Sequence, residues 1–126
     1  MSDKTIGAIE WHDLTVDDAS TVRDFYKSVV GWQTSKASMG DYDDYNIQLP
    51  DSGETVAGVC HARGFNEKMP HQWMIYVRVA SVEESAAETV RLGGKVIDGP
   101  KAMGSDDFCV IQDPAGAVLG LVSSRP

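Results

Sequence analysis

The sequence predicts an α+β fold made of two β-α-β-β-β units in tandem. The first observation is an internal repeat, because the stretch that begins at Trp11 matches the stretch that begins at Met74 after a shift of 63 positions (74 − 11). The second is that this shift aligns like with like, as in the pairs Leu14 and Val77, Asp18 and Ser81, and Gly31 and Gly94. The third is that strand-like alternation and helix-like periodicity follow in the same order in both halves.

The length of 126 residues fits a single domain, residues 1–126, in which each unit is too small to bury a sufficient core alone. We expect module one at residues 6–63, a linker at 63–71 and module two at 72–124. The two modules should therefore share a core, or pair with the modules of another chain.

In module one, the sequence predicts a strand over residues 6–16 and then a helix that Asp17 or Asp18 caps and Gly31 ends. Apolar residues at helical spacing predict the buried face of this helix: Val22, Phe25, Tyr26 and Val29. Alternating stretches bounded by turn residues predict three further strands, at 32–38, 42–49 and 54–62.

In module two, a strand is expected over residues 72–79, and Ser81 with Glu84 has the pattern of a capping box at the start of the second helix. This helix ends at Leu92, and its predicted buried stripe is Val82, Ala86, Thr89 and Val90. Three further strands are expected at 95–98, 107–112 and 117–123. We expect Gly99-Pro100 to stop the first of these strands and residues 113–116 to form a tight turn.

Composition and charge exclude several classes of protein. The formal net charge of −8 argues against DNA, RNA or an anionic membrane as the main partner. The sequence has no apolar run long enough to span a membrane and no signal-peptide pattern. Cys60 and Cys109 do not make a disulfide framework, and both lie in apolar strand patterns, which predicts buried thiols. We therefore expect a cytoplasmic protein.

Three motifs carry a resemblance to a known family. They are the helix end 24–32 (DFYKSVVGW), the hairpin 110–118 (VIQDPAGAV) and the opening 11–14 (WHDL). Together they resemble the vicinal oxygen chelate superfamily, which includes glyoxalase I, bleomycin-resistance proteins and extradiol dioxygenases. The resemblance implies a curved mixed sheet around a cavity. It also implies a homodimer, because such troughs are commonly completed by a second chain in this family.

The resemblance also implies where a metal ion would bind. Metal-dependent members hold a divalent ion with His, Gln and Glu side chains on the first and last strands of the units, and the ion acts as a Lewis acid. The family's ligand positions fall here on Trp11, Met74 and Gly120, with a fourth around residues 58–60. An indole, a thioether and a missing side chain are unsuitable ligands for hard divalent metals. We therefore expect no metal and no other cofactor, and the alternative is a divalent metal held by a displaced set: His12, His61 and His71.

Strand alternation predicts the ligand-binding residues. Leu14 and Val16 are apolar and should face the helix, so residues at odd positions of the first strand face the other way. With their counterparts in module two, the expected ligand-binding residues are Trp11, Asp13, Met74, Tyr76 and Arg78. Aromatic walls with a few polar groups are typical of a small-molecule pocket. Asp13 and Arg78 either pair with each other or recognise opposite ends of a ligand.

These observations favour a metal-free, glyoxalase-like protein that binds a small aromatic or amphipathic molecule, with sequestration as in bleomycin-resistance relatives as one form. The alternative is an enzyme of the same superfamily, a lyase, isomerase or dioxygenase, that uses a displaced metal set or an acid/base pair around Asp13. Asp13 is the candidate catalytic residue in that case. A third interpretation is a protein-interaction module, which a dry, closed trough would favour.

Overall fold

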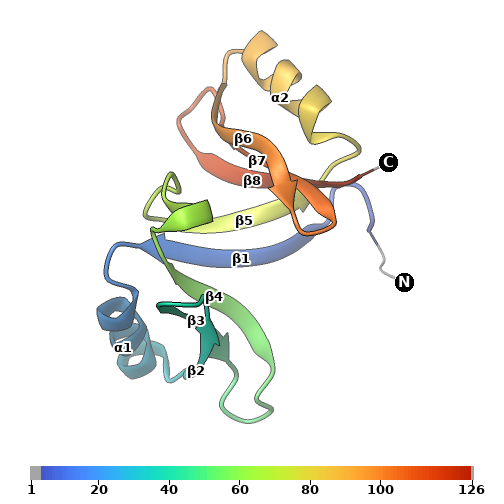
Figure 1. The fold of residues 1–126 in the computed structure, drawn as a ribbon. Helices are drawn as coiled ribbons and strands as arrows, with labels where there is room; N and C mark the ends of the chain where they lie inside the picture. The colour runs from blue at the N-terminus through green and yellow to red at the C-terminus, as the bar shows by residue number, and fades with distance from the viewer. Residues whose placement is uncertain (1–3, 126) are drawn as a thin grey trace. The chain divides into compact units, whose positions relative to one another are not determined.

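The structure, a computed structural model, describes residues 4–125 and confirms the α+β class with two β-α-β-β-β repeats (Figure 1). Contacts between residues divide the described chain into two compact units. The α1 unit comprises His12–Trp73, and the α2 unit comprises the described residues of Met1–Trp11 and Met74–Pro126. In the part of the chain that the structure describes, no helix is long and apolar enough to cross a membrane.

The first repeat runs from β1 (Ile9–Val16) through α1 (Ala19–Val30) to three further strands, β2 (Gln33–Ser38), β3 (Asp43–Gln48) and β4 (Thr55–His61). β1 pairs in parallel with β4, and the other neighbours pair antiparallel, in the order β2-β3-β4-β1. A short 3-10 helix, η1 (Gly64–Asn66), lies in the expected linker.

The second repeat runs from β5 (Trp73–Arg78) through α2 (Val82–Arg91) to β6 (Lys95–Met103), β7 (Asp106–Gln112) and β8 (Val118–Ser124). β5 pairs in parallel with β8, and the remaining pairs are antiparallel, in the order β5-β8-β7-β6. In this unit, α2 lies along one face of the strands β6, β7 and β8 (Figure 1). The two repeats therefore have the same topology, as the shift of 63 positions predicted.

The predicted helix caps are confirmed. The side chain of Asp18 accepts a hydrogen bond from the Thr21 N–H at 3.2 Å, and that of Ser81 accepts one from the Glu84 N–H at 3.2 Å. Gly31 ends α1 in the left-handed conformation, with φ +87°. In α2 the corresponding left-handed residue is Gly93, one position earlier than the repeat suggested.

Part of each predicted helix stripe was wrong. The side chains of Phe25 and Val29 in α1 are 56% and 64% exposed, and Val90 in α2 is 61% exposed. The helices face their sheets through Ala19, Val22 and Tyr26 in α1, and through Val82, Ser85, Ala86 and Thr89 in α2, so Ala86 and Thr89 were predicted correctly. In α1, apolar residues occupy two neighbouring flanks of the helix, so periodicity alone does not decide which flank is buried.

The expectation that Gly99-Pro100 stops a strand was also wrong. β6 continues through both residues to Met103, with shifts of register on either side of Asp98. β6 is the edge strand of its sheet, and proline is tolerated there because its missing N–H need not bond to a neighbouring strand.

The core of each unit lies between its helix and its sheet. In the α1 unit the buried cluster is Ala19, Tyr45, Ile47, Ala57 and Val59. In the α2 unit the buried cluster is Val82, Ala86, Cys109 and Leu121, with Val77 and Val79 packed against it. Because strand residues alternate, these contacts also define which side chains lie on the opposite face of each sheet. Cys60 and Cys109 are both free thiols, half-buried and buried respectively.

Candidate functional site

Three of the expected ligand-binding residues lie together on β5 of the α2 unit. Val77 and Val79 face α2, so Met74, Tyr76 and Arg78 lie on the opposite face of the sheet, as alternation predicted. Their exposed fractions are 1%, 6% and 2%. These side chains are therefore packed into the protein rather than presented to solvent.

Tyr76 packs over Gly120 on the neighbouring strand β8. A Cβ atom at Gly120 would lie 2.4 Å from Cδ2 of Tyr76 and 3.4 Å from Cε1 of Phe108, so no side chain fits at this position. The rings of Tyr76 and Phe108 lie 5.8 Å apart between centroids. The position to which the family resemblance assigns a carboxylate ligand is thus occupied by an aromatic ring.

Arg78 is held by two carboxylates of its own unit. Its Nε and Nη2 atoms donate to the two oxygens of Glu10 at 2.7 Å each, and Nη2 also donates to Asp106 Oδ2 at 3.3 Å. The Arg78 side chain is 3% exposed, and Lys4 adds a second cation 3.4 Å from Asp106. The hydrogen bonds from Arg78 lower the pKa of both Glu10 and Asp106. The geometry is that of a structural ion pair. Strand alternation alone had not identified its two carboxylates.

Asp13 lies in the α1 unit, on the face of the sheet opposite α1. It is aligned with Gly58 in the parallel pairing of β1 and β4. A Cβ atom at Gly58 would lie 3.6 Å from Asp13 Cβ and 3.9 Å from Cys60 Sγ, so these three residues adjoin one another. Burial raises the pKa of the Cys60 thiol, and the charges of Asp13 and Asp44 raise it further. Cys60 is therefore a protonated thiol rather than a nucleophile at neutral pH.

Asp44 is the buried member of this polar group, with 5% of its surface exposed. It accepts a hydrogen bond from the His61 N–H at 2.8 Å. The His61 Nδ1 atom lies 3.5 Å from Asp44 Oδ1 and is buried without a hydrogen bond from any described residue. We call Asp13, Asp44, Gly58 and Cys60 the polar face of the α1 unit. Asp13 adjoins Gly58, a position that carries no side chain, and Asp44 lies near Cys60.

Trp11, Tyr42 and Tyr45 have different surroundings. Trp11 is half-buried and precedes Asp13 by two residues on β1, so the two share a face of that strand. Tyr45 is 8% exposed and lies in the core beneath α1, where the Arg23 guanidinium sits 4.4 Å from its ring centroid. Tyr42 precedes β3 and stacks with Arg63 at 4.0 Å. Tyr45 therefore belongs to the core of the α1 unit.

The residues at the family's metal positions do not fit a metal ion. Trp11 and Met74 offer no suitable donor atom, and the space beside Gly120 is filled by Tyr76. Between residues 4 and 125, no group of three or more His, Cys, Asp or Glu side chains is arranged to hold a metal. Of the displaced set, His71 lies 3.6 Å from Asp17 at the surface and His61 lies beside Asp44.

Comparison with known proteins agrees with the fold. Residues 6–121 match the family described as the Glyoxalase/Bleomycin resistance protein/Dioxygenase superfamily. CFP32 of Mycobacterium tuberculosis, which carries a provisional glyoxylase name, is 30% identical over 117 residues, covering 91% of this chain and 45% of CFP32. The anthracycline biosynthesis protein DauV of Streptomyces sp. (strain C5) is 27% identical over 94% of this chain and 42% of its own.

Among solved structures, methylmalonyl-CoA epimerase from Mycobacterium tuberculosis matches with a TM-score of 0.52 at 13% identity, covering 100% of this chain and 94% of the epimerase. At this identity the match shows a shared fold. The chain spans less than half the length of the curated relatives CFP32 and DauV.

Proposed function

Because the chain belongs to the Glyoxalase/Bleomycin resistance protein/Dioxygenase superfamily, we propose that it binds a small aromatic or amphipathic molecule without the family's usual metal ion. The ligand site is centred on Asp13 in the polar face of the α1 unit. Met74, Tyr76 and Arg78 have packing roles in this proposal, since each is almost fully buried.

One observation carries the proposal, which is the contrast between the corresponding faces of the two units. In the α2 unit, this face is filled by Tyr76 and Phe108 over Gly120. In the α1 unit the comparable position is Gly58. A Cβ atom added there would meet its neighbours only at ordinary van der Waals distance, and these neighbours include Asp13 and Cys60. Binding sites commonly combine a few fixed polar groups with apolar and aromatic walls. A carboxylate such as Asp13 would select ligands that carry a hydrogen-bond donor or a positive charge.

The test is a fragment screen by NMR on the metal-free protein, followed by titration of the hits into Asp13→Asn. The conservative change removes the charge and leaves the shape, and a hydrogen bond to a charged group contributes about 1.5–3 kcal/mol. We therefore expect the affinity of the hits to fall roughly tenfold or more. Asp51→Asn, at an exposed turn position, is the matched control and should bind as the wild type does. Hits that bind Asp13→Asn as tightly as wild type would refute the assignment.

An enzyme of the same superfamily is the second candidate, and the proximity of Asp13 and Asp44 to Cys60 favours it. Two carboxylates in one site can act as general base and general acid when their pKa values differ. The provisional glyoxylase name of CFP32 and the epimerase activity in the name of the structural neighbour agree with such a role. Incubation of the hits with wild type and Asp13→Asn, with and without divalent metal, separates the two candidates. Conversion by wild type alone would establish the enzyme.

We also infer a homodimer, because in this superfamily a second chain commonly completes such troughs. We likewise infer a cytoplasmic location, because both cysteines are free thiols and disulfides are rare in the cytosol. Light scattering on the purified protein measures the oligomeric state, and a monomer at micromolar concentration would contradict the dimer.

A further inference from the structure

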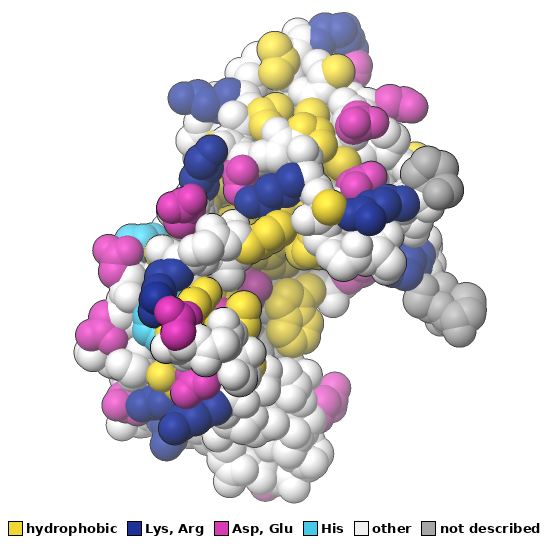
Figure 2. All heavy atoms as spheres, viewed as in Figure 1, with side chains coloured by type: hydrophobic (Ala, Val, Ile, Leu, Met, Phe, Trp, Pro, Cys, Tyr) yellow, Lys and Arg dark blue, Asp and Glu magenta, His cyan; other side chains and the backbone are white. Residues whose placement is uncertain are grey.

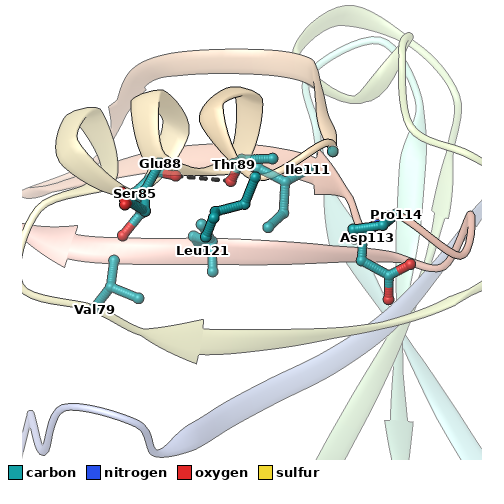
Figure 3. Close-up of a pocket in the computed structure, with 10 residues that line it drawn as sticks. Val79, Ser85, Glu88, Thr89, Ile111, Asp113, Pro114 and Leu121 are labelled. Carbon is teal, nitrogen blue, oxygen red and sulfur yellow. Dashed lines mark hydrogen bonds between the residues drawn. The ribbon is translucent and has the colours of Figure 1, made fainter.

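The α2 unit contains a pocket on the helix side of its sheet, away from the face that holds Tyr76 and Gly120. Its volume is about 330 Å³, which is within the usual range for a small-molecule site. Figure 3 shows α2 above the pocket and the strands below it, with Ser85 and Thr89 reaching down from the helix. Val79, Ile111 and Leu121 form the apolar floor.

The internal repeat explains why this pocket exists. The N-caps Asp18 and Ser81 correspond, so Thr89 of α2 occupies the place of Tyr26 in α1. Both residues are half-buried and lie seven positions after the first helical residue. A tyrosine thus reaches into the helix–sheet layer of one unit where a threonine leaves the same layer open in the other.

An aromatic ring fits this layer, as the α1 unit shows. The Tyr26 ring lies 5.4 Å from the ring of Trp73 and 5.9 Å from that of Trp32, and its hydroxyl accepts a hydrogen bond from Trp73 Nε1 at 3.0 Å. The residue that corresponds to Trp32 in the second repeat is Lys95. The fold therefore has room for one ring at this place in each repeat, and the chain itself supplies the ring in only one of the described units.

The edge of the pocket is acidic. Glu88 and Asp113 line it, and its lining residues include no Lys, Arg or His. The Thr89 hydroxyl donates to the Ser85 carbonyl oxygen at 2.7 Å, so it is used within the helix. Glu88 also pairs with Arg91 at the surface, and Asp113 Oδ1 accepts two backbone N–H groups of the adjoining turn. Figure 2 shows hydrophobic side chains reaching the surface among charged ones in the region of α2.

We propose that this pocket binds a small aromatic amine, whose ring takes the place that the Tyr26 ring fills in the other repeat. The apolar floor accommodates the ring, and the ammonium group lies toward Glu88 and Asp113 at the edge. Carboxylates accept hydrogen bonds and do not donate them when ionised, so an anionic substituent on the same ring is disfavoured. This site is separate from the polar face around Asp13, and either can exist without the other.

The test uses tryptamine as the probe, and indole-3-acetate carries the same ring with the opposite charge. In ¹⁵N NMR titrations of the wild-type protein, tryptamine should shift the amide signals of Thr89, Gly94 and Ile111, and indole-3-acetate should bind more weakly. Shifts confined to residues around Asp13 and Gly58 would overturn the proposal while supporting the other site. Equal binding of the two probes would also overturn it.

Two variants test the pocket directly. Thr89→Tyr gives α2 the residue of α1 and should fill the pocket, abolish the tryptamine shifts and raise the unfolding temperature. Ala87→Tyr adds the same side chain at an exposed position of the same helix and should leave binding unchanged. Glu88 lies at the surface, and Glu88→Gln should weaken the binding of tryptamine by a factor of roughly two to five. The same change should weaken the binding of uncharged indole by a smaller factor. Unaltered tryptamine binding in both Thr89→Tyr and Glu88→Gln would refute the site.

Discussion

At the scale of single residues, Arg78 shows what strand alternation can and cannot predict. Alternation correctly placed it on the face away from the helix, beside Met74 and Tyr76. Its partners Glu10 and Asp106 come from β1 and from the start of β7, so identifying them requires the register of strands that are far apart in sequence. A pattern within one strand carries no information about that register.

The Arg78 ion pair predicts a pH-dependent contribution to stability. Hydrogen bonds from Arg78 lower the pKa of Glu10 below its ordinary value of 4.5. Stability from this group is therefore fully present above about pH 4.5 and is lost as the pH falls through the lowered folded-state pKa. Glu10→Gln should reduce the free energy of unfolding at pH 7 by about 1–3 kcal/mol, and the deficit should shrink on acidification. Urea unfolding at pH 7 and at low pH measures both effects.

Glu54→Gln is the control for this change, because Glu54 is an exposed glutamate outside the Arg78 network. It should match the wild type at both pH values. A Glu10→Gln protein as stable as wild type at pH 7 would mean that the ion pair makes no net contribution.

At the scale of elements, the sequence predicted the existence and order of the helices and strands better than their buried faces. The caps at Asp18 and Ser81 could be predicted because a short polar side chain before an apolar periodic run is a local signal. The exposed positions of Phe25 and Val29 could not, because the rotation of α1 on its sheet depends on Trp32 and Trp73, which follow the helix in sequence.

The N-terminus of α2 provides a test at this scale. Ser81 accepts from the Glu84 N–H, and Ser123 of β8 accepts from the Val82 N–H at 3.0 Å, so two of the helix's unpaired donors are satisfied by serine hydroxyls. Ser81→Ala should lower the free energy of unfolding by about 1 kcal/mol, whereas Ser81→Asn preserves a capping oxygen and should stay close to wild type. Urea denaturation curves measure the difference, and equal losses in both variants would show that capping is not the cause.

At the scale of the whole molecule, the chain contains the same topology twice, and the two repeats differ in which side chains pack on each face of the sheet. The α1 unit fills its helix–sheet layer with Tyr26 and leaves a polar opposite face, whereas the α2 unit fills the opposite face with Tyr76 and leaves a pocket under its helix. The repeat and the family positions at Trp11, Met74 and Gly120 could be read from the sequence. The ring that covers Gly120 and the pocket beside Thr89 could not be predicted in this way, because both depend on the register and packing of the folded strands.

We propose that this member of the superfamily works without the usual metal ion, and metal stoichiometry tests this proposal most directly. Mass spectrometry on protein purified without a chelator or a histidine tag, with thermal unfolding in Zn, Ni, Mn and Fe(II), measures both content and binding. Bound metal would stabilise the folded state by mass action. We predict substoichiometric metal and no shift of the unfolding temperature. One ion per chain together with stabilisation would contradict the claim and would direct mutagenesis to His12, His61 and His71.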